Sequence, residues 1–342
     1  MPSILATVLS DYKTTQEKRL EQGYSIAFCL MKKAKVMYCL TTRGLYSELF
    51  NLCLATVYCE KMGYELCINS YYWNAKIEKG WNDYFESVFK CYNNYFSAQD
   101  KIYTKEKPWI GKIYYKPREF FTFYASEIAN SLYLLLHPHT LLTKDIFERM
   151  RSDKFINDIL GDNAFALMAE SYKKMYHINS ITKQELSKRK LLNNLPDDYI
   201  GLHIRRGDKI VSKEMNDIHL NRYVDEALKH RDLSSNVFVA TDDVTVVDYM
   251  RPRFEDYGMK VFYNKLNKSR GHNEATFNQS SKQFRYEETI NVLLEMDILT
   301  HSRYFIGTYT SNLSRVVPFY LGLNKCTSLD NDWNIINSMN GM

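Results

Sequence analysis

The sequence predicts an α/β protein with two Rossmann-like domains that face each other across a cleft. Two observations lead to this fold class. Short apolar runs typical of buried strands alternate with helical patterns, and a polar stretch, Ile181 to Asp198, divides this alternation in two. The 342 residues, 45% of them hydrophobic, are enough to build two cores. We therefore expect a first domain at 1–195 and a second at 196–342, each with a parallel sheet covered on both faces by helices.

The first half begins with a β-α-β pattern. Lys35 to Thr42 is apolar enough for a buried strand, and helical periodicity follows from Leu45 to Met62. Arg43 and Gly44 supply the turn between them, and Tyr64 to Asn69 supplies the next strand. From about Phe120 to Tyr176 the pattern is helical and rich in aromatic residues. A strand, a helix and a second strand in this order are typical of a parallel sheet.

The second half alternates more regularly, after a stretch whose charge and Pro196 predict a helix end and a linker. Apolar runs predict strands at Ile200–Ile204, Val237–Ala240, Lys260–Tyr263 and Tyr304–Gly307. Helical periodicity predicts helices at His219–His230, Val244–Tyr257, Tyr286–His301 and Ser311–Leu321, with a polar loop at Asn264–Arg285.

Composition narrows the function classes. A net charge of +5 without a dense basic run suits a small anionic ligand better than a nucleic acid, and the 27 tyrosines follow no RNA-binding motif. Seven cysteines without a C-x-x-C pair predict reduced thiols. No apolar run is long enough to span a membrane, so we expect a cytoplasmic chain; a Golgi catalytic domain without its anchor would look similar.

Polar clusters follow three of the strands predicted for the second half. They are "HIRRGDK" (203–209), "ATDD" (240–243) and "GTYTSN" (307–312). In open parallel sheets, ligands bind beyond the carboxyl ends of the strands. Three polar clusters at one edge therefore predict a binding site.

The first cluster carries two arginines directly after a strand. Alternation places His203 and Arg205 on one face and Arg206 on the other. Arginine grips phosphate oxygens with a planar fork, and Asp208 could orient one guanidinium. The alternative is a solvated loop with a local ion pair, and His203 alone could be a core histidine.

Other candidates also allow two interpretations. Thr310 and Ser311 open a helix, where they would hold an anion or simply cap the helix. Glu295, in an apolar helix, faces water or else a cleft, where a carboxylate would match the N–H donors on the edge of guanine. The acids in "TDD" (241–243) and "DND" (330–332) could suggest a metal, but such acids are common in caps and turns, and we expect no metal.

Together, "GLHIRRGDK", "VFVATDD" and "TYTSNLSRV" resemble the α-1,6-fucosyltransferase family. A fainter match follows Arg43 and Gly44 and includes Trp73 and Gly80-Trp81. The resemblance implies a GT-B-type glycosyltransferase with two Rossmann-like domains, which uses GDP-fucose as donor, inverts the sugar and needs no metal or other cofactor. It also implies a glycan acceptor on the side of the first domain, where Arg43, Gly44 and Trp73 are possible cleft residues.

The resemblance also implies roles for single residues. His203 and Glu295 would contact guanine, Arg205 would hold the departing diphosphate with Thr310 and Ser311 beside it, and Asp242 and Asp243 would line the donor pocket. Arg206, Asp208 and Lys209 would order the loop and the pyrophosphate region, with Lys209 and Arg205 counted among the catalytic groups. The acceptor base would be Glu214, although a one-residue insertion makes Lys213 the ungapped equivalent.

Departures from the family leave the acceptor open. Gly207 stands where animal members usually have threonine, and we expect no room for an SH3-like domain after the last helix. Alternative functions are transfer from another GDP-sugar or a UDP-sugar, a non-catalytic glycan- or nucleotide-binding protein, and an RNA binder.

Overall fold

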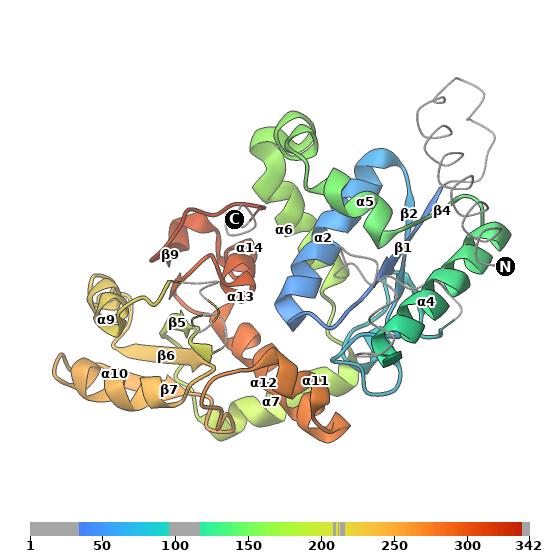
Figure 1. Cartoon of the computed structure of the whole chain (residues 1–342). Coiled ribbons are helices and arrows are strands. Elements are labelled where there is room, and N and C mark those ends of the chain that lie inside the picture. Colours follow the sequence, from blue (N-terminus) through green and yellow to red (C-terminus); the bar gives the residue numbers. More distant parts are fainter. Residues whose placement is uncertain (1–33, 96–116, 208–209, 211, 213–215, 337–342) are drawn as a thin grey trace. The chain divides into compact units, whose positions relative to one another are not determined.

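Two parallel β-sheets, one in each half of the chain, organise the computed structural model (Figure 1). The structure describes residues 34–95, 117–207, 210, 212 and 216–336, with only the backbone of 117–123 and 126. The two sheets confirm the predicted fold class. No helix within these ranges has the length and apolarity needed to cross a membrane.

The first sheet has the strand order β3-β2-β1-β4. Its strands are β1 (Lys35–Cys39), β2 (Glu65–Asn69), β3 (Lys90–Tyr92) and β4 (Thr140–Leu142). Val36 and Tyr38 point into a large core with α2 (Leu45–Met62), whereas Met37 and Cys39 pack with Tyr133 of α4 (Pro117–Leu136). The period-two alternation of β1 therefore gives the sheet a helix on each face.

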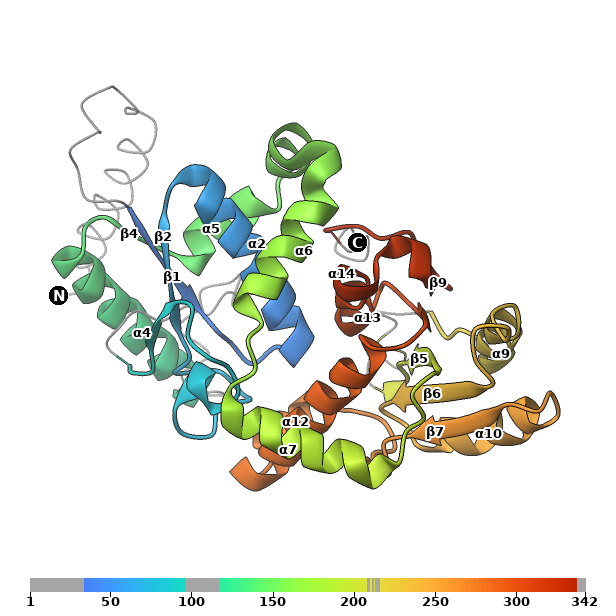
Figure 2. The ribbon, with the colours of Figure 1, turned by 180° about the vertical axis from the view of Figure 1, so that it is seen from behind.

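The remaining elements of the first half lie on the α2 side or lead to the second half. They are the short helix η2 (Gly80–Asp83), α5 (Thr143–Met150), the π-helix η3 (Lys154–Leu160), η4 (Gly161–Asn163), α6 (Ala164–Met175) and α7 (Ser180–Asn193). Figure 2 shows α7 running alongside α12.

The second sheet has the strand order β7-β6-β5-β8-β9. Its strands are β5 (Ile200–Ile204), β6 (Asn236–Thr241), β7 (Lys260–Tyr263), β8 (Tyr304–Gly307) and β9 (Cys326–Ser328). The helices are α9 (Leu220–Leu228), α10 (Thr245–Glu255), α11 (Glu274–Gln279), α12 (Lys282–Leu299), α13 (Asn312–Val316), α14 (Pro318–Leu321) and η5 (Leu323–Lys325). Ile200, Leu202 and Ile204 face the core formed with α9 and α10, so Gly201 and His203 face α12 and α13.

The two halves share apolar packing through α13 and α14. Phe319 of α14 stacks on Phe50 of α2, with 6.2 Å between ring centroids, and lies 5.5 Å from the ring of Tyr172 in α6. One core cluster accordingly includes residues of both sheets, such as Tyr38 and Phe238.

Several predicted boundaries are wrong. Ile181 to Asn193 belongs to the helix α7 and is not a linker. This helix packs against α12, to which Arg189 and Lys190 donate hydrogen bonds. The polar loop at 264–285 contains α11 and the first turn of α12, and the predicted helix at 311–321 is broken before Pro318 into α13 and α14. The three-residue strands β3, β4 and β9 were not predicted, because so short a run has no readable pattern.

Candidate functional site

The carboxyl ends of β5, β6 and β8 bring the three polar clusters together. The backbone N–H of Arg206 donates to Oδ1 of Asp242 at 2.7 Å, which joins the first cluster to the second. Nδ1 of His203 lies 2.7 Å from Oγ of Ser314, two residues beyond the third cluster. The predicted site is thus one place in the structure, at the edge where a parallel sheet binds its ligands.

Asp242 holds the arginine loop against the loop that follows β7. Its carboxylate accepts the N–H of Arg206, pairs with Nη1 of Arg205 at 3.2 Å, and accepts the N–H of His272 at 3.2 Å. Its carbonyl accepts the N–H of Gly271 at 2.7 Å. The carboxylate therefore fixes the position of the Arg205 guanidinium, of which 20% remains exposed.

Gly207 is needed where these two loops meet. A Cβ on Gly207 would lie 2.4 Å from Oδ2 of Asp242 and 2.6 Å from the carbonyl oxygen of His272. Real side chains do not approach backbone or carboxylate atoms so closely, so this position accommodates glycine and no larger residue in the conformation described. The arginine loop and the loop after β7 are therefore closely packed at Gly207.

His203 is a neutral, buried base. Its side chain is enclosed, and burial followed by the positive charge of Arg205 lowers its pKa from 6.5 to about 3. The ring is held by Ser314, whose own side chain is fully buried. At neutral pH the ring therefore has one donor and one acceptor nitrogen, and Nδ1 is engaged by the hydroxyl of Ser314.

Glu295 faces the interior of the protein and not water. Its Oε1 accepts a hydrogen bond from Nδ2 of Asn267 at 3.1 Å, and the same amide donates to the carbonyl of Thr241 at 2.8 Å. Burial raises the pKa of Glu295 to about 8, although hydrogen bonds from Asn267 and Asn264 oppose the rise. A buried carboxyl with so few partners would accept N–H donors from a ligand.

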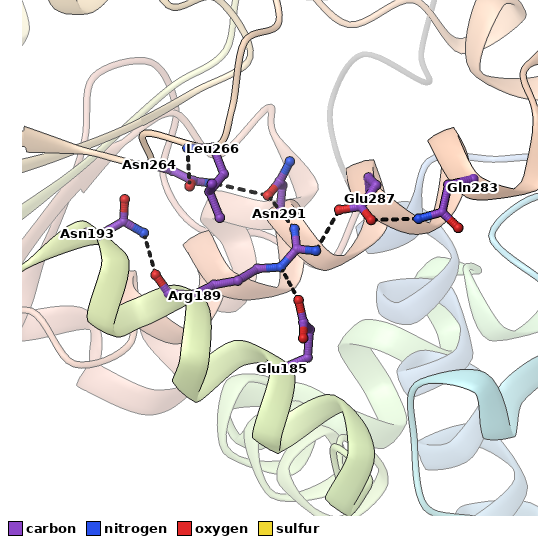
Figure 3. A network of polar contacts seen from close by, with 8 residues as sticks. All are labelled: Glu185, Arg189, Asn193, Asn264, Leu266, Gln283, Glu287 and Asn291. Atoms are coloured by element: carbon purple, nitrogen blue, oxygen red, sulfur yellow. Dashed lines mark hydrogen bonds and ion pairs between the residues drawn. The ribbon is translucent and has the colours of Figure 1, made fainter.

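A polar network behind Glu295 positions Asn264 (Figure 3). Arg189 of α7 donates to Glu185 at 2.7 Å, to Glu287 at 2.6 Å and to Asn291 at 3.2 Å. Asn291 in turn accepts from Nδ2 of Asn264 at 3.4 Å. The network ties the loop after β7 to α12, the helix that carries Glu295.

The loop after β8 is organised by Asp330. The N–H of Thr310 and its hydroxyl donate to Oδ2 of Asp330 at 3.2 and 2.5 Å, and the N–H of Tyr309 donates to Oδ1 at 2.7 Å. Asp330 therefore serves as an acceptor for this loop. Ser311 occupies the N-cap position of α13, but its side chain forms no capping hydrogen bond. Capping thus explains neither hydroxyl.

Two further predicted residues have local partners. Oδ1 of Asp243 accepts from the N–H and the hydroxyl of Thr245, at 3.0 and 2.7 Å, at the start of α10. The guanidinium of Arg206 forms an ion pair with Asp217, away from Asp242. The other predicted residues of this region, Asp208, Lys209, Lys213 and Glu214, lie outside the described residues.

The first-half candidates separate into two environments. Arg43 lies in the turn before α2, with its guanidinium 5.2 Å from the ring centroid of Phe147, and burial lowers its pKa. Gly44 is the N-cap residue of α2. Trp73 is almost fully buried and stacks on Trp81, with 6.2 Å between ring centroids, so most of its surface belongs to the core.

Sequence reasoning missed Ser314, Asn267 and His272. Ser314 could have been suggested by its place one helical turn after Ser311. No local signal distinguished Asn267 or His272 within a loop rich in polar residues, because their partners, Glu295 and Asp242, are distant in sequence.

A family model for the alpha-(1,6)-fucosyltransferase N- and catalytic domains matches residues 153–321, which contain all three clusters. Residues 153–321, just under half of the chain, belong to the α-1,6-fucosyltransferase family. The chain is thus a glycosyltransferase by family, as the motifs predict. Among curated proteins, none matches this sequence.

Solved structures of a fucosyltransferase have the same fold. NodZ alpha-1,6-fucosyltransferase soaked with GDP-fucose is 16% identical, with a TM-score of 0.50 over 84% of this chain and 93% of that chain. Fucosyltransferase NodZ from Bradyrhizobium is 17% identical, with a TM-score of 0.50 over 85% and 94%. Within the described residues, no three His, Cys, Asp or Glu side chains lie close enough together to bind a metal ion.

Proposed function

We propose that this chain transfers fucose from GDP-fucose to a hydroxyl group of a glycan, with inversion at the anomeric carbon and without a metal ion. The observation that carries the proposal is the fixed guanidinium of Arg205, held by Asp242 where the three strand-end clusters meet. The donor is supported by the family and by NodZ structures soaked with GDP-fucose or co-crystallized with GDP.

The nucleotide would bind at the carboxyl end of β5, beside α12. Glu295 accepts the N–H donors of guanine, and the neutral ring of His203 completes its contacts. Arg205 then faces the diphosphate, with Ser311 beside it. Since the leaving diphosphate gains negative charge as its bond to the sugar breaks, a fixed cation stabilises the transition state more than the ground state.

The transfer is a single displacement. The acceptor oxygen attacks the anomeric carbon, the bond from that carbon to the diphosphate oxygen breaks, and its electron pair leaves with GDP. The proton of the hydroxyl passes to a base, for which we propose Glu214, with Lys209 helping to neutralise the diphosphate. We assign the acceptor side to residues 1–195 and the nucleotide to 196–342.

A reducing, cytoplasmic setting fits the cysteines of this chain. The six cysteines in the described ranges are free thiols, and four of them are buried. Burial raises the pKa of Cys67 to about 11, which keeps that thiol protonated.

Thermal-shift titration with GDP, UDP and several sugar nucleotides, with and without EDTA, tests the proposal. A ligand that binds only the folded chain raises its melting temperature. A shift with GDP and GDP-fucose that EDTA does not change is the expected result. A shift with UDP alone would favour another donor, and the absence of any shift would favour a non-catalytic protein; either result would overturn the proposal.

A further inference from the structure

A polar pocket lies outside the group of residues assigned to the donor. Its volume is about 610 Å³, and it lies between the loop after β2 and the helices α11 and α12. Asn74 joins its two walls, because its Nδ2 donates to the carbonyl of Thr42 at 2.8 Å and to Oδ1 of Asn278 at 2.9 Å. The residues that matter for its chemistry are Tyr71, Tyr72, Trp73, Lys76, Lys282 and Arg285.

The lining carries three cations and one acid. The cations are Lys76, Lys282 and Arg285, and the acid is Glu78. Within the described ranges, none of the three cations forms an ion pair with a carboxylate. Nζ of Lys76 instead donates to the carbonyl of Tyr71 at 2.6 Å, and Nη1 of Arg285 donates to the carbonyl of Ser280 at 2.5 Å. Neutral carbonyls do not neutralise the positive charge of either group.

A nearby carboxylate is already engaged elsewhere. Asp83 accepts the backbone N–H groups of Ile77, Glu78 and Lys79, at distances from 2.8 to 3.3 Å. These hydrogen bonds stabilise the loop, and the negative charge of Asp83 offsets part of the positive charge beside it. Burial, followed by the charge of Lys282, lowers the pKa of Lys76, whereas Asp83 opposes this shift. Three cations against Glu78 and Asp83 still leave a net positive charge.

Two buried donors on the lining residues lack hydrogen-bond partners within the described part of the chain. They are Nε of Arg285 and the indole Nε1 of Trp73. An unsatisfied buried donor is costly, and such groups in native proteins call for a ligand or water as acceptor. Both atoms are enclosed, so an anion in the pocket would have to be bound by the lysines and by the outer nitrogens of Arg285.

The pocket also has an aromatic wall suited to a sugar. The rings of Tyr71 and Tyr72 meet edge to face, with 5.0 Å between centroids. The short helix α11 connects this wall with the donor site: Asn278 lines the pocket, and the neighbouring Phe277 lies 5.6 Å from the ring of His272, which contacts Asp242. The wall of the pocket is therefore linked through α11 to the loop that contacts Asp242.

We propose that this pocket binds an anionic sugar of the acceptor, whose carboxylate, sulfate or phosphate group lies among Lys76, Lys282 and Arg285. The inference rests on the proposed function, since it names the acceptor class of the same enzyme. It distinguishes this chain from an enzyme that takes a neutral glycan.

Binding of glucose, glucuronate, glucose 6-sulfate and glucose 6-phosphate to the full chain tests this inference. Ligand-observed NMR is run with the protein saturated with GDP, so that phosphate does not compete at Arg205. We expect at least one charged sugar to bind about tenfold more tightly than glucose, and this preference to fall when salt rises from 0.05 to 0.5 M. Equal binding of all four sugars would overturn the inference.

Variants identify the pocket as the place of binding. Lys282→Met and Arg285→Met should each abolish most of the preference for the charged sugar, whereas Lys188→Met, at an exposed lysine of α7, should keep it. Lys282 is exposed at the start of α12, so its variant is expected to melt like the parent chain. A preference that survives both pocket variants would place the anion elsewhere and refute the inference. The GDP-induced thermal shift reports separately on the proposed function.

Discussion

Binding of GDP should release a proton from Glu295. In the free protein its carboxyl has a pKa of about 8 because it is buried, so it is mostly protonated at neutral pH. Guanine would place N–H donors against it, and hydrogen bonds from donors favour the ionised form. If the carboxyl is fully ionised in the complex, about 0.9 proton leaves per GDP at pH 7.

Calorimetry in buffers of different ionisation enthalpy measures this proton directly. GDP affinity should rise between pH 6 and 8 by up to about tenfold per pH unit, and then level off. Glu295→Gln should bind GDP more weakly, without proton release and without this pH dependence. Glu255→Gln, at an exposed position in the last turn of α10, should behave like the parent chain.

The free energy of unfolding of Glu295→Gln shows whether this variant folds. The folded chain retains the proton of Glu295 between pH 4.5 and about 8, whereas the unfolded chain has lost it, so stability falls as pH rises through this window. At pH 8 the buried carboxyl lowers the free energy of unfolding by about 4 kcal/mol relative to pH values below 4.5. Urea unfolding of Glu295→Gln should show that most of this loss has been removed. A parent chain whose GDP enthalpy does not depend on the buffer would refute the assignment of Glu295 to guanine.

Three further variants test the arginine loop and its neighbours. Arg205→Ala should lower kcat/KM for transfer by about 100- to 1000-fold, as for loss of an oxyanion-hole donor, and near-normal transfer would contradict the assignment to the diphosphate. Gly207→Ala should lose about 2 kcal/mol of unfolding free energy and weaken GDP binding, because its Cβ would collide with Asp242 and His272; unchanged values would show that the loops separate easily. Asp330→Asn should lower the unfolding free energy by about 2 kcal/mol in urea titrations, since its carboxylate accepts several hydrogen bonds of the loop after β8, and an unchanged value would mean that the loop does not depend on it.

The sequence predicted best what depends on local pattern. β7 and β8 have the bounds predicted from their apolar runs, and α2 those predicted from its periodicity. His203, Arg205 and Asp242 could be placed together because parallel strands end at one edge of a sheet.

What depended on long-range contacts could not be predicted. The charged stretch of α7 was interpreted as a linker. Its Arg189 is buried by Glu287 and Asn291, which lie about a hundred positions further along the chain. Likewise, the use of Asp330 by the loop after β8 follows from the pairing of β9 with β8, and β9 is too short to be recognised.

The stacking of Phe319 on Phe50 has a consequence for how substrates enter. Because α14 shares one apolar core with α2 and α6, swinging the halves apart would expose packed aromatic rings to water. A wide hinge motion is therefore expensive, and the chain should melt in one cooperative step. We therefore expect donor and acceptor to enter through small movements of surface loops, while the two halves stay packed together.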